Sequence, residues 1–215
     1  MTDYHTHILP GIDDGSKDIN MTKTMLEMEH DMGVTHIYAT PHFYSQQMAM
    51  DEFLENRSHS LQQVKALLET SPEFPQISVG AEIFYFEGIG KADNLEKLCV
   101  EGTDFFLLEM PFRQWNNKCI HDVEKLLVKQ QLKVVLAHIE RYYQFQKDRN
   151  AWNNILDMPV TLQMNANSFI KHVKSRKLCY KILDDYDDCI LGSDCHNTTS
   201  RPPNLKYVKT IIENK

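Results

Sequence analysis

The stretch FFLLEM at residues 105–110 and the stretch VVLAH at residues 134–138 carry the pattern that decides the fold. Both are continuous apolar runs rich in β-branched or aromatic residues, and a longer amphipathic stretch of helical character separates them. Such strands, alternating with helices, are typical of a parallel sheet covered by helices. The sequence therefore predicts an α/β fold of about seven strand and helix pairs, arranged as a closed or nearly closed barrel. The other runs of this kind are Tyr4–Leu9, Thr35–Ala39, Ile77–Phe84, Val160–Met164 and Cys189–Gly192.

The chain is interpreted as a single domain covering residues 1–215. Its 215 residues are 42% hydrophobic, which suffices for one core and is short for two. No internal repeat, low-complexity segment or linker divides it. The first helix is predicted over Ser16–Met32, with Ser16 as N-cap and Gly33 as the stop. A long loop is expected over residues 44–52 and a closing helix over residues 204–215.

Composition excludes several functions. The chain has 23 Lys and Arg against 30 Asp and Glu, a net charge of -7, and no basic cluster. This balance argues against binding to nucleic acid or to an anionic membrane. The apolar runs are too short to cross a bilayer, and no secretory signal is visible after Met1. The five cysteines form no C-x-x-C pair, which fits reduced thiols and predicts a cytoplasmic protein.

Metal-ligating residues gather at the ends of the predicted strands. His5 and His7 form an H-x-H pair, and a spacing of two places both side chains on one face of a strand. In an α/β barrel the carboxyl ends of all strands meet at one rim, so residues far apart in sequence become neighbours. Carboxylates crowded there would repel each other unless cations lay between them. The sequence therefore predicts a site for several metal ions, built from His5, His7, Asp14, His42, Glu82, Glu109, His138, Asp194 and His196.

The order of these motifs resembles a known superfamily. H-x-H, Asp-Asp-Gly, T-P-H, G-x-E, L-x-E, H-I-E-R and S-D-x-H follow one another from Asp3 to about Pro203, as in the PHP (polymerase and histidinol phosphatase) superfamily. The runs HILPGIDDGS, AHIERY and DCHN, the last followed by RPP, are similar to the bacterial metal-dependent protein tyrosine phosphatases of capsule and exopolysaccharide synthesis. The resemblance implies a distorted (β/α)7 barrel with its active site at the carboxyl ends of the strands.

The resemblance also implies a trinuclear site, usually of manganese. Ligand chemistry alone would suit Mn, Fe or Zn about equally. By the resemblance, Glu82 bridges the first two metals. The first metal would take His5, His7, Glu82 and Asp194, the second Glu82, Glu109 and His138, and the third Asp14, His42 and His196.

Such a site favours hydrolysis of a phosphate monoester. Three divalent cations and four carboxylates leave an inner charge of about +2, which attracts a dianion. Several metals can lower the pKa of a bridging water and clamp the attacking and leaving oxygens. Arg141 and Arg201 follow ligand runs and are candidates to bind the phosphoryl oxygens, which the resemblance favours. An aromatic slot for the substrate ring is a further candidate, formed by Phe43, Tyr44, Phe84, Tyr85 and Phe86.

Three alternatives stay open. Cys195 and Arg201 have the Cys-x5-Arg spacing of thiolate phosphatases, although the loop lacks glycine and Pro202 follows it. A histidinol-phosphatase-like enzyme would share the barrel and the metals. A binding module would hold phosphotyrosine without cleaving it. The leading prediction is a manganese-dependent phosphatase acting on a phosphotyrosine protein, the tyrosine-rich tail of a bacterial tyrosine kinase of polysaccharide export.

Overall fold

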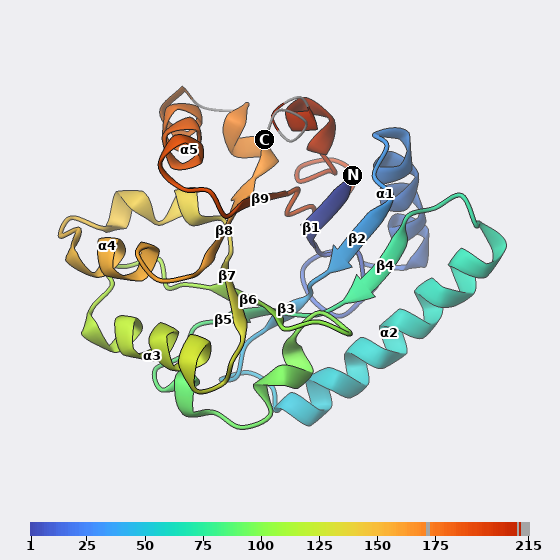
Figure 1. Ribbon diagram of the computed structural model, residues 1–215. Helices are drawn as coiled ribbons and strands as arrows, with labels where there is room; N and C mark the ends of the chain where they lie inside the picture. Colours follow the sequence, from blue (N-terminus) through green and yellow to red (C-terminus); the bar gives the residue numbers. More distant parts are fainter. Residues whose placement is uncertain (171–172, 210, 212–215) are drawn as a thin grey trace.

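The computed structural model describes residues 1–170, 173–209 and 211 (Figure 1). Its strands are β1 (Thr2–Thr6), β2 (His36–Ala39), β3 (His42–Phe43), β4 (Gln76–Val79), β5 (Glu82–Phe84), β6 (Phe105–Glu109), β7 (Lys133–Leu136), β8 (Thr161–Asn165) and β9 (Cys189–Gly192). Its α-helices are α1 (Ile19–Asp31), α2 (Met50–Thr70), α3 (Asn117–Val128), α4 (Asn150–Leu156) and α5 (Val173–Asp185). Short 3-10 helices occupy Ile89–Lys91, Leu95–Leu98, Ile139–Arg141, Tyr143–Phe145, Ala166–Phe169 and Leu205–Val208.

The strands pair in parallel in two sheets, and the helices lie outside them (Figure 1). One sheet has the order β1-β2-β4 and the other β3-β5-β6-β7-β8-β9. An isolated parallel bridge between Thr6 and Cys195 brings the end of β1 beside the segment after β9. The backbone N–H of His7 donates to the Cys195 carbonyl there at 2.9 Å. The predicted α/β class with parallel strands is confirmed.

The observed strands differ from the predicted ones in two places. Ile77–Phe84, expected as one strand, is split into β4 and β5 at Gly80 and Ala81. A Cβ at Gly80 would lie 2.8 Å from the Val100 side chain, so only glycine lets the chain pass. His42 and Phe43 form an additional strand, β3, after Pro41, which has no N–H for the β2 ladder. At both breaks the chain passes from the three-stranded sheet to the six-stranded sheet.

Helix boundaries also differ from the predicted ones. The first helix begins at Ile19 rather than Ser16, because the Asp18 side chain accepts from the backbone N–H groups of Asn20 and Met21 at 2.9 Å. The loop predicted over residues 44–52 ends earlier, since α2 begins at Met50. Of the closing helix predicted over residues 204–215, the structure shows the 3-10 turn Leu205–Val208, and residues 210 and 212–215 lie outside the described part.

The core lies between the strands and the surrounding helices. Every residue of β6 is buried, and α1 and α3 add Leu26 and Val123 from outside. Among the described residues, none of the helices is both long and apolar enough to cross a membrane. The packed strands hold the segments at their carboxyl ends in fixed relative positions, and the candidate site is built there.

Candidate metal centre

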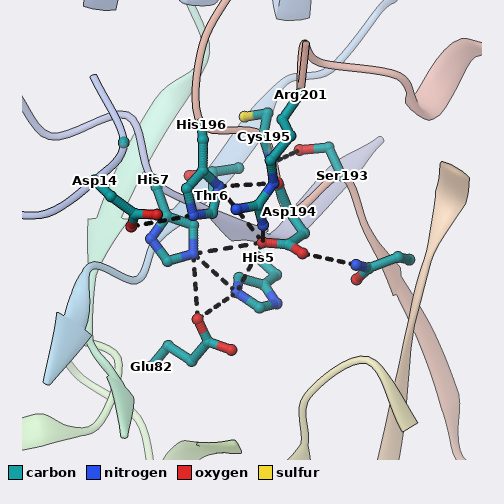
Figure 2. Close-up of polar contacts among 12 residues, drawn as sticks. His5, Thr6, His7, Asp14, Glu82, Ser193, Asp194, Cys195, His196 and Arg201 are labelled. Atoms are coloured by element: carbon teal, nitrogen blue, oxygen red, sulfur yellow. Dashed lines mark hydrogen bonds and ion pairs between the residues drawn. The ribbon is translucent and has the colours of Figure 1, made fainter. Parts of the chain in front are cut away.

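The nine residues predicted as metal ligands converge at the carboxyl ends of the strands. His5 lies on β1, and His42 and Glu82 face each other across the β3–β5 register. Glu109 ends β6, and His138 follows β7. Asp194 and His196 follow β9, close to β1 (Figure 2). Seven strand ends and loops distant in sequence therefore contribute to one cluster.

Glu82 lies at the centre of this cluster and is fully buried. Its Oε2 lies 3.1 Å from His5 Nε2 and 3.2 Å from His7 Nε2 (Figure 2). The same oxygen lies 3.0 Å from His42 Nδ1. Its Oε1 lies 2.9 Å from His138 Nε2, which is also 3.6 Å from Glu109 Oε1. One carboxylate thus contacts four imidazoles. This is the arrangement expected of a carboxylate that bridges cations.

The remaining ligands extend the cluster on both sides of Glu82. Asp14 Oδ1 lies 3.4 Å from His196 Nε2 and 3.6 Å from His42 Nε2. Asp194 Oδ1 lies 3.6 Å from His7 Nε2 and 3.7 Å from His5 Nε2. Three sets have ligand atoms within 4.8 Å of one another and could each hold a cation: His7, Asp14, His42 and His196; His5, His7 and Asp194; and His42, Glu82 and Glu109.

Side chains that the sequence reasoning missed orient the ligands. Asp13 Oδ2 lies 2.7 Å from His7 Nδ1 and accepts from the His42 backbone N–H at 3.0 Å. Gln163 Oε1 accepts from the His138 backbone N–H at 2.7 Å and lies 3.0 Å from His5 Nδ1. Asn165 donates to Asp194 Oδ2 at 2.7 Å. The signal was the alternation of polar residues in the β8 sequence TLQMN, where a buried strand would otherwise be apolar. Such partners fix the ring orientation of metal-binding histidines.

The backbone is strained at two ligands. His138 has φ 33° and Asp194 φ 53°, in the left-handed region that non-glycine residues seldom adopt. Residues held in this way cost of order 1–3 kcal/mol and are concentrated at functional sites. The backbone is also closely packed near Asp194, because a Cβ at Gly192 would lie 2.6 Å from the His5 Cβ. The chain is therefore held in an unfavourable conformation that directs ligands toward Glu82.

Burial and mutual charge shift the pKa values in the cluster. Burial opposes protonation of His7, but Asp13 and Glu82 outweigh it and raise the pKa of His7 to about 10. Burial and repulsion from Glu82 raise the pKa of Glu109 to about 8. Burial and the neighbouring His7 lower the pKa of His196 to about 3. Protons therefore hold part of the charge balance, and a bound cation would displace them.

The residues fit a group of divalent cations. Glu82 Oε2, His42 Nδ1 and His196 Nε2 are buried and have no hydrogen-bond partner within the described ranges, although ligand atoms lie close to each. Buried polar atoms without partners are costly, and cations between them would remove that cost. Mixed imidazole and carboxylate donors suit Mn, Fe or Zn.

Both predicted arginines lie at the edge of the cluster. Arg201 donates to Asp194 Oδ1 at 2.7 Å, and Arg141 Nη1 lies 3.6 Å from Asp194 Oδ2 (Figure 2 shows Arg201). Their side chains are 40% and 44% exposed, so each guanidinium is accessible to a ligand. Arg141 also lies over the ring of Phe112, 4.9 Å from its centroid. A guanidinium in this position can form paired hydrogen bonds to phosphoryl oxygens.

The predicted aromatic slot is only partly present. The rings of Tyr44 and Phe84 are 5.6 Å apart beside the cluster, and Tyr44 is 5.2 Å from His42. Phe43 is buried in the core, and the Tyr85 hydroxyl donates to Asp122 at 2.9 Å, away from the ligands. Phe112 was not anticipated, and its half-exposed ring stacks on His138 at 5.8 Å.

The thiolate alternative fails on the environment of Cys195. The thiol is fully buried and lies 3.9 Å from Glu29 Oε1, and burial and this carboxylate raise its pKa well above the usual value. A nucleophilic cysteine needs a lowered pKa and access to substrate.

We expect Cys195→Ser to keep phosphatase kcat/KM within about threefold of wild type, because the buried thiol does not reach substrate. A loss above about 100-fold in a folded, metal-loaded Cys195→Ser protein would restore the thiolate mechanism.

Known proteins resemble the chain over its whole length. Tyrosine-protein phosphatase CpsB of Streptococcus agalactiae serotype III (strain NEM316) is 28% identical over 225 residues, covering 99% of this chain and 89% of that protein. Tyrosine-protein phosphatase YwqE of Bacillus subtilis (strain 168) is 26% identical and covers 99% of this chain and 84% of that protein.

A solved structure from work on B. subtilis YwqE and Streptococcus pneumoniae CpsB, described as metal-dependent tyrosine phosphatases, superposes with a TM-score of 0.85. The match covers 100% of this chain and 87% of that chain at 20% identity, and it confirms the fold. The curated relatives that match over almost the whole chain are named as tyrosine-protein phosphatases. The family model described as "Capsular polysaccharide synthesis, CpsB/CapC" matches residues 1–215, and the chain belongs to this family. The resemblance seen in the sequence motifs is thereby confirmed.

Proposed function

We propose that this protein hydrolyses phosphotyrosine monoesters in proteins with the help of divalent cations, with manganese as the physiological metal. The observation that carries the proposal is the convergence of five histidines and three further carboxylates around Glu82. Such a cluster attracts a dianionic phosphoryl group once cations neutralise it. The CpsB and YwqE relatives are named as tyrosine-protein phosphatases, which supports the same substrate class.

About three cations would be held by the nine ligands. His5, His7, Glu82 and Asp194 would hold the first, and Glu82, Glu109 and His138 the second. Asp14, His42 and His196 would hold the third, and His7 lies near enough to join them. When bound, the cations would supply an activated water and neutralise charge on the phosphoryl group.

The protein's own residues would orient the substrate. Arg141 and Arg201 would bind the non-bridging phosphoryl oxygens from the edge of the cluster. Asp13 and Gln163 hold His7 and His5 in one ring orientation. Seven of the nine ligands are buried, Asp14 being exposed and His42 partly so, and this burial lowers the local dielectric constant and strengthens the charge interactions among them.

The fold and setting complete the proposal. Counted together, β2 with β3 and β4 with β5 are two interrupted strands, which supports a distorted (β/α)7 barrel in a single domain of residues 1–215. We propose a cytoplasmic enzyme whose partner is the tyrosine-rich tail of a bacterial tyrosine kinase of polysaccharide export. Membership in the capsular polysaccharide family supports this setting.

Removal of metal provides the test. We expect elemental analysis to find about three divalent metals per chain, and chelation to lower phosphotyrosine-peptide hydrolysis by more than about 100-fold, because the cations would supply the activated water. Manganese re-addition should restore the rate. A protein whose activity survives complete removal of metal would overturn the proposal, and a preference for histidinol phosphate over phosphotyrosine peptide would favour the alternative phosphatase.

A further inference from the structure

An elongated groove leads away from the metal centre. Neither cation binding by the candidate ligands nor phosphoryl binding by the arginines accounts for this groove. Its inner cavity, about 390 Å³, borders Asp194, and its outer cavity, about 670 Å³, extends to α5. Arg141, Ser168 and Ser175 line both cavities, so the two are neighbours. We call them together the flank groove. Its other lining residues used below are Asn167, Arg201, Glu140, Tyr143, Val173 and Lys174.

The flank groove is cationic although the chain carries a net charge of -7. Arg141, Arg201 and Lys174 line it, and Lys174 is exposed on α5. Two carboxyl groups also line it, and both are buried, although Glu140 Oε2 has no hydrogen-bond partner among the described residues. Asp194 accepts from Arg201 at 2.7 Å, and buried Glu140 accepts from Ser168 Oγ at 2.7 Å. Positive charge is therefore presented to a ligand while negative charge is held inward.

The remaining lining suits an extended peptide. The Asn167 amide and the Ser175 hydroxyl supply neutral donors and acceptors of the kind that bind main-chain groups. At the outer end, Tyr143 is 37% and Val173 58% exposed, and both offer apolar contact to side chains. With the phosphoryl group of a substrate held at the cations, the peptide segment adjoining the phosphotyrosine would lie next to this groove.

Resting on the proposed function, we infer that the flank groove binds the substrate segment adjoining the phosphotyrosine and selects acidic residues there. Charge complementarity carries this inference, because a carboxylate in the segment would approach exposed Lys174, whereas of the two groove carboxyl groups Asp194 is paired with Arg201 and Glu140 is buried. A small aryl phosphate has no flanking segment and would not use the groove.

The test compares flanked and unflanked substrates. Phosphotyrosine decapeptides would carry three Glu or three Lys residues, before or after the phosphotyrosine, with p-nitrophenyl phosphate as the substrate lacking flanks. Lys174→Glu reverses charge inside the groove. Lys177→Glu makes the same change on an exposed residue of the same helix that lines neither cavity, and it is the matched control.

We expect kcat/KM to be roughly fivefold higher for a Glu-flanked peptide than for its Lys-flanked counterpart, and Lys174→Glu to remove most of this preference. Hydrolysis of p-nitrophenyl phosphate should stay within about twofold. Equal effects of Lys174→Glu and Lys177→Glu, or no preference in wild type, would overturn the inference.

Binding provides a readout independent of turnover. Fluorescence anisotropy with a labelled Glu-flanked peptide carrying a non-hydrolysable phosphonate should show roughly fivefold weaker binding to Lys174→Glu and unchanged binding to Lys177→Glu. Absence of p-nitrophenyl phosphate hydrolysis by the wild-type protein would contradict the proposed function. Equal peptide binding by the two variants would contradict the inferred role of the groove in binding the flanking segment.

Discussion

Glu82→Gln is expected to lower phosphotyrosine hydrolysis by more than about 100-fold and to reduce the bound metal, because this carboxylate contacts four imidazoles from the middle of the cluster. The amide keeps nearly the same volume but removes the charge that would join two cations. Its NH2 group would also point donors at histidines or metals that need an acceptor. Elemental analysis and kcat/KM on the same sample measure both effects.

Glu87→Gln is the matched control. Glu87 is exposed and pairs with Lys118 at the surface, so the same chemical change there should leave metal content and rate within about twofold. Circular dichroism would confirm that the Glu82→Gln protein remains folded. A folded Glu82→Gln protein with full metal content and more than about a tenth of the wild-type kcat/KM would contradict the central role of Glu82.

Arg201→Ala should lower kcat/KM by roughly 10- to 100-fold while the metal content stays near that of wild type. Arg201 is half exposed at the edge of the cluster, and its guanidinium is positioned to contact a phosphoryl group rather than to hold a cation. Arg201→Lys keeps the charge but loses the planar pair of donors, so an intermediate loss is expected. Steady-state kinetics and elemental analysis of both variants test this role.

Arg176→Ala serves as the control for Arg201, since Arg176 is exposed on α5 and lines neither cavity of the flank groove. Its kinetics should match wild type within about twofold. If Arg201→Ala instead lost metal in proportion to activity, Arg201 would act by holding Asp194 in place, and phosphoryl binding would not be its role.

Local patterns predicted most of the strands and the side chains that gather at their carboxyl ends. Apolar runs such as Phe105–Met110 are visible because a buried parallel strand must be apolar on both faces. His138 and Asp194 could be identified because strand ends in α/β folds meet at one edge. The break of Ile77–Phe84 at Gly80 was missed, because it depends on the approach of Val100 from another segment.

The sequence by itself thus determined the α/β class, the succession of strands and helices along the chain and the residue types available as ligands, since these follow from hydrophobic periodicity and local spacing. Only the tertiary structure decided that Glu82 lies among four histidines, that Gln163 orients His5, and that Lys174 shares a groove with Arg141. Distances between strand ends depend on sheet order, register and left-handed turns such as that at Asp194, and these arise from contacts between segments far apart in the chain.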